Sequence, residues 1–315
     1  MGLIMSTDSP LADNTVEVRE VGPRDGLQNE ETLPVEERIA LIDALSGTGL
    51  AAIEAASFVH PKAIPPMAGS AEVMAGISRA PGVRYRALVP NERGGHDALS
   101  AGVDEIEVVM SISETHNLKN IKMTPDASLE QVVAITALSH GADTPVEAIL
   151  STAFGCAYEG DVPAARVARY ARRVLDEAGV DELSFGDTSG MATPRVVIEL
   201  LDALAAEGIE ASDVAMHFHN TRNTGLANIV VALQRGVRRF DASIGGLGGC
   251  PYSPGATGNV PTEDVVHMLE DWGYNTGVNL ENLIEAGKLA EELVGRQLPS
   301  QVLRSGPRTR TVPVD

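Results

Sequence analysis

Four side chains that lie far apart in the sequence are of the types that bind a divalent metal ion. His217 and His219 form an i, i+2 pair, so both imidazoles point to the same side of an extended strand. Asp25 offers a carboxylate oxygen and Asn259 a neutral amide oxygen. Two imidazoles, one carboxylate, one amide and water have octahedral character and would accept Mg²⁺ or Mn²⁺. The histidine pair alone is also compatible with a polar pocket that holds no metal.

Arg24 directly precedes the proposed ligand Asp25. A buried guanidinium beside a cation needs a compensating anion, and a developing enolate oxygen would supply one. This interpretation indicates an enzyme that makes or breaks a carbon–carbon bond next to a carbonyl group. The alternative is an ion pair from Arg24 to Glu54 or Glu20 that only stabilises the fold. Beside a metal site, we favour the functional interpretation.

A glycine-rich loop between Gly245 and Asn259 carries Cys250 near its tip. Glycines allow such a loop to move or to approach a ligand closely. Cys250 is therefore a candidate acid–base or nucleophilic group that the loop delivers on closure, and the alternative is an inert surface thiol. A phosphate cradle is disfavoured because no Lys-Ser/Thr pair follows the glycines. Cys156, the other cysteine, is expected to be structural.

Two further groups of polar residues have two interpretations each. Asp187 could orient a metal ligand or a substrate hydroxyl, or it could cap the helix that follows. Lys119, Asn120 and Lys122 form a small basic island that could hold the phosphates of a large anionic substrate, or they could belong to a solvated loop. The remaining histidines show no spacing pattern and are expected mostly on the surface: His60, His96, His116, His140 and His267.

Short β-branched runs alternate with amphipathic helical stretches along the chain. Strands are expected at residues 16–21, 52–58, 84–89, 105–110, 146–152, 182–186, 214–219 and 239–244. Helices are expected at residues 35–46, 67–79, 93–101, 127–140, 163–178, 194–207, 223–235, 262–271 and 279–295. Eight strand-then-helix units favour an α/β fold of the (β/α)8 TIM-barrel type, with extra C-terminal helices, over an open sheet. We expect a flexible N-terminal segment at 1–15, one catalytic domain at 16–300, and a mobile C-terminal tail at 301–315.

The barrel prediction places the candidate residues on one face. Barrel enzymes carry their chemistry at the C-terminal ends of the strands and in the loops that follow. Arg24 and Asp25 follow the first predicted strand, the histidine pair closes the seventh, and the glycine-rich loop follows the eighth. Glu54 lies within the second strand and Asp187 follows the sixth, so both could support the site.

Composition excludes several classes of partner. The chain has 24 basic and 44 acidic residues and a net charge of −20, which argues against nucleic acid or an anionic membrane as partner. No apolar run approaches the ~20 residues of a membrane span. The first fifteen residues contain no Lys or Arg and include Asp8 and Asp13, unlike a secretory or mitochondrial presequence. We expect a cytoplasmic protein.

Four stretches of this chain resemble the hydroxymethylglutaryl-CoA lyase family. They are Glu17–Glu30, Ile53–Val59, the strand with the two histidines, and Gly246–Asn259. The resemblance covers residues 16–300. The Gly-Leu-Gly-Gly-Cys-Pro loop is its most specific motif, since it separates the lyases from the isopropylmalate and homocitrate synthases of the same superfamily. His-x-His is the least specific.

The resemblance implies a metal-dependent cleavage of 3-hydroxy-3-methylglutaryl-CoA to acetyl-CoA and acetoacetate by a retro-Claisen/aldol-type reaction. A divalent cation on Asp25, His217, His219 and Asn259 would acidify the substrate's tertiary hydroxyl. Arg24 would stabilise the thioester enolate and Cys250 would protonate it. The initial base stays open between Asp25, His217 and a metal-bound water, with support from Glu54 and Asp187. The expected contacts to the acyl-CoA substrate are Arg24, Gln28, Lys119, Asn120 and Arg222. The resemblance also implies a homodimer.

One departure from the family pattern bears on the substrate. The histidines are followed by Asn220-Thr221-Arg222-Asn223, where the better-known lyases usually have Asp-Thr-Tyr-Gly. An additional cation near the metal could reshape the acid end of the pocket. Isohexenylglutaryl-CoA and citramalyl-CoA are therefore alternative substrates, and an acetyl-CoA-condensing synthase is a further alternative. A barrel without catalysis would be expected to lack a metal ligand or the loop cysteine, and this chain has both.

Overall fold

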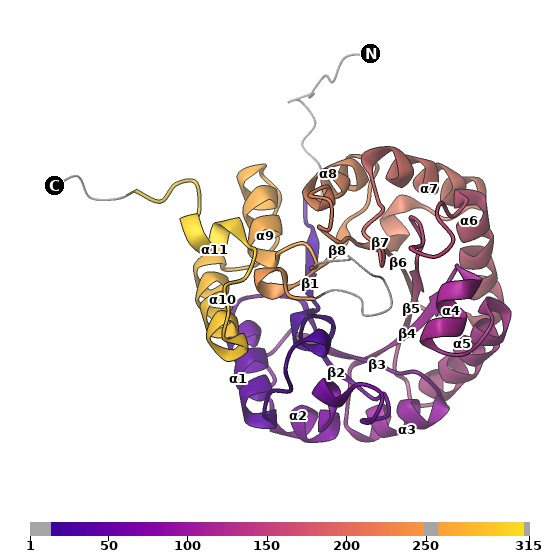
Figure 1. Cartoon of the computed structure of the whole chain (residues 1–315), viewed down its shortest axis with the longest axis horizontal. Coiled ribbons are helices and arrows are strands. Elements are labelled where there is room, and N and C mark those ends of the chain that lie inside the picture. Colours follow the sequence, from indigo (N-terminus) through magenta and orange to yellow (C-terminus); the bar gives the residue numbers. More distant parts are fainter. Residues whose placement is uncertain (1–13, 249–257, 312–315) are drawn as a thin grey trace, which may run out of the picture.

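Eight parallel strands close into a barrel (Figure 1). The computed structural model describes residues 14–248 and 258–311. The strands are β1 Glu17–Glu20, β2 Ala52–Ser57, β3 Arg84–Leu88, β4 Glu105–Ser111, β5 Val146–Ser151, β6 Glu182–Gly186, β7 Val214–His217 and β8 Arg239–Ala242. Each strand pairs with its neighbour in sequence, and β8 pairs with β1. The predicted TIM barrel is confirmed.

A ring of helices surrounds the barrel (Figure 1). The helices are α1 Val35–Ser46, α2 Ser70–Gly76, α3 Glu92–Ser100, α4 Glu114–Asn120, α5 Pro125–His140, α6 Ala164–Arg173, α7 Pro194–Ala206, α8 Gly225–Gln234, α9 Thr262–Asp271, α10 Leu280–Val294 and α11 Gln301–Ser305. Helix α9 follows β8 and completes the ring, α10 is the expected additional C-terminal helix, and α11 follows it. Within the two described ranges, no helix is long and apolar enough to cross a membrane.

Three segments differ from the sequence prediction. Residues 114–120, expected in a loop, form α4, whose N-terminus is capped by the Ser113 hydroxyl at 3.2 Å from the His116 N–H. The helix is short and has no apolar periodicity, which is why the pattern did not reveal it. The seventh strand ends at His217, and His219 instead forms an isolated bridge with Asn259. Helix α11 lies inside the predicted tail, and its buried Val302 and Leu303 extend the packed fold beyond residue 300.

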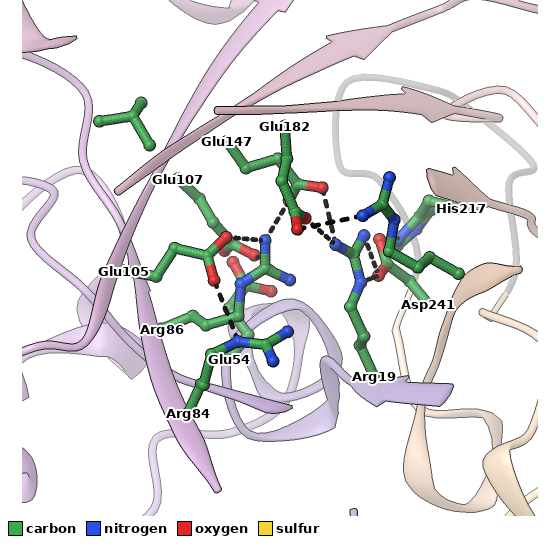
Figure 2. Close-up of polar contacts among 12 residues, drawn as sticks. Arg19, Glu54, Arg84, Arg86, Glu105, Glu107, Glu147, Glu182, His217 and Asp241 are labelled. Atoms are coloured by element: carbon green, nitrogen blue, oxygen red, sulfur yellow. Dashed lines mark hydrogen bonds and ion pairs between the residues drawn. The ribbon is translucent and has the colours of Figure 1, made fainter. Parts of the chain in front are cut away.

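Ion pairs between buried side chains from several strands lie inside the barrel (Figure 2). Charged residues alternate with apolar ones at the start of β1, β3 and β4, so the charged side chains at these positions point inward and the apolar ones pack against the helices. Arg19 pairs with Glu147 at 2.8 Å and with Asp241 at 2.6 Å. Arg86 pairs with Glu107 at 3.1 Å and also contacts Glu147. Buried charges are tolerated only when they are paired in this way.

Candidate metal centre

A single turn of π-helix after β1 positions Arg24 and Asp25. It spans Gly22–Gly26, and the N–H groups of residues 24, 25 and 26 all donate to the Val21 carbonyl, at 3.2, 2.7 and 3.2 Å. The turn brings both side chains over the C-terminal end of the barrel. Asp25 and Arg24 therefore leave the strand on its functional face, as the sequence predicted.

A buried glutamate, Glu20, ties this turn to the segments that follow β8. Its carboxylate accepts the N–H of Gly22 at 2.7 Å, the N–H of Ile244 at 2.8 Å and the hydroxyl of Thr262 at 2.7 Å. Burial raises the pKa of Glu20 to about 7, although the three hydrogen bonds oppose that shift. Glu20 thus joins the turn after β1 to the segments after β8, and it is not the ion-pair partner of Arg24.

Three of the four predicted metal ligands converge. The ligating atoms of Asp25, His217 and His219 all lie within 4.8 Å of one another, and the two imidazole centroids are 5.3 Å apart. One cation can contact donors at that separation. The predicted juxtaposition of one carboxylate and two imidazoles is present in the fold.

Asn259 completes the donor set. Its Nδ2 donates to Asp25 Oδ2 at 2.7 Å and to the Leu247 carbonyl at 3.0 Å. Both partners are acceptors, so this orientation assigns Oδ1 as the free oxygen. That oxygen is buried and has no partner among the described residues, and the same holds for His219 Nδ1. An unpaired amide oxygen and an unpaired imidazole nitrogen, both buried beside a carboxylate, fit a divalent cation bound by oxygen and nitrogen ligands.

The glycine-rich loop begins and ends at this centre. The Gly258 N–H donates to the Gly248 carbonyl at 2.9 Å, and a Cβ on Gly248 would lie 2.5 Å from Asn259 Nδ2. Gly248 also has φ +120, a backbone conformation that favours glycine. Residues 249–257, which include Cys250, lie outside the described residues, so the role of Cys250 stays a prediction.

Arg24 lies beside the metal ligands and also forms an ion pair with Glu54, so both of its predicted roles are compatible with the structure. Its Nε donates to Glu54 Oε1 and its Nη1 to Asp25 Oδ1 at 3.0 Å, and the side chain is largely buried. Burial alone would raise the pKa of Asp25, but Arg24, His217 and His219 outweigh it, and the pKa is lowered. Asp25 is therefore anionic and suited to a cation. The ion pair with Glu54 exists, and it holds Arg24 beside the metal ligands.

The two histidines occupy different electrostatic environments. Burial and the neighbouring His217 lower the pKa of His219 to about 4, so its imidazole is neutral at pH 7, the form that binds metal. His217 Nδ1 contacts Asp241 Oδ2 at 3.2 Å. Because a carboxylate can only accept, Nδ1 carries the proton and Nε2 is left for a ligand. The sequence analysis did not identify Asp241 as part of the site.

A cavity of about 420 Å³ opens beside the centre. Its polar lining includes Arg24, Asp25, Gln28, Glu54, Asn120, His217 and His219. Gln28 Nε2 donates to Asp25 Oδ1 at 2.8 Å, so this predicted contact residue also steadies a ligand. Aliphatic and proline side chains, among them Ile64, Leu88 and Ile135, form other parts of the wall. A cavity with one charged end and an apolar wall suits a substrate that has one charged part and one apolar part.

Three predicted residues lie outside this lining. The Asp187 carboxylate accepts the N–H groups of residues 191 and 192 at 2.7 and 2.9 Å and so holds the loop before α7. The alternative prediction that Asp187 caps the following helix is wrong, because the Thr193 hydroxyl caps α7. Arg222 Nη1 donates to the Gly190 carbonyl at 2.6 Å. Lys119 is exposed on α4, with its ammonium 4.9 Å from the centroid of the Tyr158 ring. None of the three contributes to the described wall of the cavity.

His116 lines the cavity, contrary to its expected place on the surface. Its Nδ1 lies 2.6 Å from the Ser111 hydroxyl, which lies 2.8 Å from the hydroxyl of Ser151. Its Nε2 is buried without a partner in the described part of the chain. Burial lowers the pKa of His116, so the ring is neutral. The capping position of Ser113, three residues earlier, was the only sequence signal that could have placed this histidine in a helix.

Comparisons with known proteins agree with this site. Residues 15–290 match a family model described as HMGL-like. The hydroxymethylglutaryl-CoA lyase YngG of Bacillus subtilis is 50% identical over 290 residues, which are 92% of this chain and 96% of the relative. The mitochondrial hydroxymethylglutaryl-CoA lyase of Homo sapiens is 42% identical over 293 residues, which are 92% of this chain and 89% of the relative.

Two solved structures show the same relationship. The crystal structure of the HMG-CoA lyase of Bacillus subtilis has a TM-score of 0.90 and 49% identity, and the match covers 93% of this chain and 98% of that chain. The structure of an HMG-CoA lyase from Acinetobacter baumannii, in complex with coenzyme A and 3-methylmalate, has a TM-score of 0.91 and 39% identity. That match covers 96% of this chain and 98% of that chain.

Proposed function

The chain belongs to the HMGL-like family, and we propose that it is a carbon–carbon lyase that cleaves 3-hydroxy-3-methylglutaryl-CoA to acetyl-CoA and acetoacetate. One observation carries this conclusion: the ligating atoms of Asp25, His217 and His219 converge within 4.8 Å beside Arg24, in a chain 50% identical to a hydroxymethylglutaryl-CoA lyase over nearly its full length. The relatives named above do not favour the isohexenylglutaryl-CoA, citramalyl-CoA or synthase alternatives.

Asp25, His217, His219 and Asn259 would hold the divalent cation, Mg²⁺ or Mn²⁺. When bound, the cation polarises the hydroxyl and carboxylate oxygens of the substrate. The free Oδ1 of Asn259 and the neutral imidazole of His219 support this assignment. Asp241 holds His217 in the tautomer that a metal ligand requires.

Arg24 is placed to stabilise the charge that develops when the carbon–carbon bond breaks. Loss of the hydroxyl proton converts the tertiary alcohol to the ketone of acetoacetate, and the bond electrons form the enolate of acetyl-CoA. Glu54 and Asp25 engage Nε and Nη1 of Arg24, and among the residues that the structure describes these bonds leave Nη2 to meet a ligand oxygen. A fixed donor aimed at a developing oxyanion typically contributes about 10²–10³-fold in rate.

Cys250 is the proposed acid that protonates the enolate carbon. Its support is the position of the loop ends, since Gly248 and Gly258 are hydrogen-bonded to each other next to the metal ligands. His116 and Asn120 are the proposed additional polar contacts in the cavity, because both line it and His116 Nε2 is unpaired within the described residues. The expected homodimer and cytoplasmic location stay predictions.

A direct assay tests the function. The purified full-length chain with Mn²⁺ is mixed with 3-hydroxy-3-methylglutaryl-CoA, citramalyl-CoA or an isohexenylglutaryl-CoA, and acetyl-CoA and the released keto acid are measured. We expect equal amounts of acetyl-CoA and acetoacetate from the first thioester, loss of both with a chelator, and recovery when Mn²⁺ is restored. Faster turnover of one of the other two thioesters would identify that thioester as the substrate in place of 3-hydroxy-3-methylglutaryl-CoA. Release of free CoA only when acetyl-CoA and a 2-oxo acid are supplied together would indicate a synthase.

A further inference from the structure

Two buried glutamates lie together in the cavity lining without enough cations to balance them (Figure 2). Glu54 on β2 and Glu107 on β4 are both nearly inaccessible to solvent. Arg24 engages Oε1 of Glu54, and Arg86 engages Oε1 of Glu107 at 3.1 Å. The second oxygen of each carboxyl group is buried and receives no N–H or hydroxyl donor from the described residues. The two carboxyl groups contact each other instead.

A contact between two carboxyl groups requires a proton, because ionised carboxylates only accept hydrogen bonds. Glu107 faces Glu54 from β2, Arg86 from β3 and Glu147 from β5. Arg86 is also shared with Glu105 and Glu147, so its single charge cannot neutralise all of its partners. Burial raises the pKa of Glu107 well above its usual range; Arg86 opposes this shift, and the charges of Glu54 and Glu147 add to it.

We propose that Glu107 is protonated in the working enzyme and donates its hydrogen to Glu54, and that it thereby positions Arg24. The role in catalysis rests on the proposed lyase function. Glu54 stays ionised, with Arg24 on one side and the Glu107 hydroxyl on the other. Ionisation of Glu107 would set carboxylate against carboxylate. Repulsion would then move Glu54, and the guanidinium of Arg24 would lose its fixed orientation toward the substrate.

Replacement of Glu107 by glutamine and by leucine separates a hydrogen-bond role from simple packing. A glutamine amide can donate to Glu54 and accept from Arg86, as a protonated carboxyl group does. In the Mn²⁺-loaded full chain, we expect Glu107→Leu to lower kcat on the order of 10²-fold, comparable to the loss of one oriented donor. Glu107→Gln should restore kcat to within about fivefold of the wild type, because it preserves the hydrogen-bond pattern.

Glu105 supplies the matched control. It lies on the same strand, is buried and contacts the same Arg86 at 2.8 Å, and it does not line the cavity that Glu54 and Glu107 share. We expect Glu105→Leu to lower the stability of the fold while kcat changes much less than in Glu107→Leu. Equal losses of kcat in the two leucine variants would overturn the positioning role.

The pH profile distinguishes a proton from a packing contact. A protonated Glu107 predicts that kcat falls as pH rises through the elevated pKa of that group. The fall should be absent in Glu107→Gln and retained in Glu105→Gln. An alkaline limb that is unchanged in Glu107→Gln would show that another group causes it and would overturn the proposal.

An infrared measurement makes the proton visible without using activity. The difference spectrum of wild type minus Glu107→Gln, recorded at a pH where exposed carboxyl groups are ionised, should contain the carbonyl band of a protonated carboxyl group that shifts in D₂O. Absence of that band overturns the proposal even if the protein cleaves 3-hydroxy-3-methylglutaryl-CoA. If the band is present but the protein has no lyase activity, the proposal of a protonated Glu107 stands and the proposed lyase function is wrong. The glutamine variant keeps this test available if Glu107→Leu fails to fold.

Discussion

Asp241 Oδ2 accepts the Nδ1 proton of His217 at 3.2 Å, and Arg19 contacts the other carboxylate oxygen of Asp241, Oδ1, at 2.6 Å. The barrel interior thus fixes the orientation of a metal ligand before any metal binds. Arg19 also pairs with Glu147, so the contact belongs to the ion-pair network of Figure 2. Binding of a cation by His217 therefore depends on Asp241 and Arg19, the buried charged residues that orient this imidazole.

Asp241→Asn should weaken metal binding. The amide is a poorer acceptor for His217 Nδ1 and leaves Arg19 without one of its anions, so we expect Mn²⁺ affinity to fall about 10–100-fold. Calorimetric titration of the metal-free protein measures this. Glu182→Gln is the control, because Glu182 also contacts Arg19, at 3.3 Å, but it is not a partner of His217. Equal losses in both variants would indicate that only the charge on Arg19 matters.

Arg24→Gln should abolish most turnover while metal binding persists. We expect kcat to fall about 10²–10³-fold. Mn²⁺ affinity should stay equal or increase, because a positive charge next to Asp25 has been removed. Arg84→Gln provides the comparison, since Arg84 pairs with Glu17 away from the cavity and its loss should leave kcat unchanged. Loss of metal from Arg24→Gln, or failure of that variant to fold, would support the structural interpretation of this arginine.

The barrel was predictable from sequence because eight amphipathic repeats leave few alternatives to closure. The site was predictable where spacing carries geometry: the i, i+2 spacing places His217 and His219 on the same side of the chain although β7 ends at His217, and Asp25 follows a strand end. Asp241 and Glu107 were not identified, because an inward-facing charge on a strand becomes meaningful only when its partners from other strands are known. His116 was missed for a related reason, since α4 is too short to show a period. The sequence could not decide whether Asp187 orients a ligand or caps the next helix, because both roles place it at the end of the same strand.

Gly248→Ala should disturb the metal centre directly. The added Cβ would lie 2.5 Å from Asn259 Nδ2, so this proposed ligand must move, and its hydrogen bond to Asp25 would be disturbed. Gly208→Ala is the matched control, because Gly208 also has positive φ but no atom within 4 Å of the added carbon. Both variants should lose about 1 kcal/mol of stability from backbone strain. Only Gly248→Ala should also lose Mn²⁺ affinity, measured by titration, and equal affinities in the two variants would argue against the placement of Asn259.

Glu263 makes the stability of the fold depend on pH. Its carboxylate accepts the Gly245 N–H, and burial raises its pKa to about 8 from 4.5. The folded state therefore holds an extra proton, so this contribution to stability is fully present below about pH 4.5 and is lost as pH rises through about 8. The free energy of unfolding should fall with pH across this window, by at most about 1.4 kcal/mol per pH unit for one proton.

Glu263→Gln should flatten that dependence, because its amide oxygen can still accept from Gly245 without titrating. Urea unfolding of both proteins between pH 5 and pH 9 gives the comparison. Some slope should remain in the variant, since burial also raises the pKa of Glu20 to about 7. Identical slopes in the two proteins would show that Glu263 does not hold the proton.

The central claim is that one divalent cation joins Asp25, His217, His219 and Asn259. An anomalous-scattering map at the Mn edge, from crystals of the full chain grown with Mn²⁺, tests this most directly. We predict one strong peak about 2.2 Å from an oxygen of Asp25, a nitrogen of each histidine and Oδ1 of Asn259. A protein that cleaves 3-hydroxy-3-methylglutaryl-CoA with Mn²⁺, yet shows its peak elsewhere or none among these four side chains, would contradict the account.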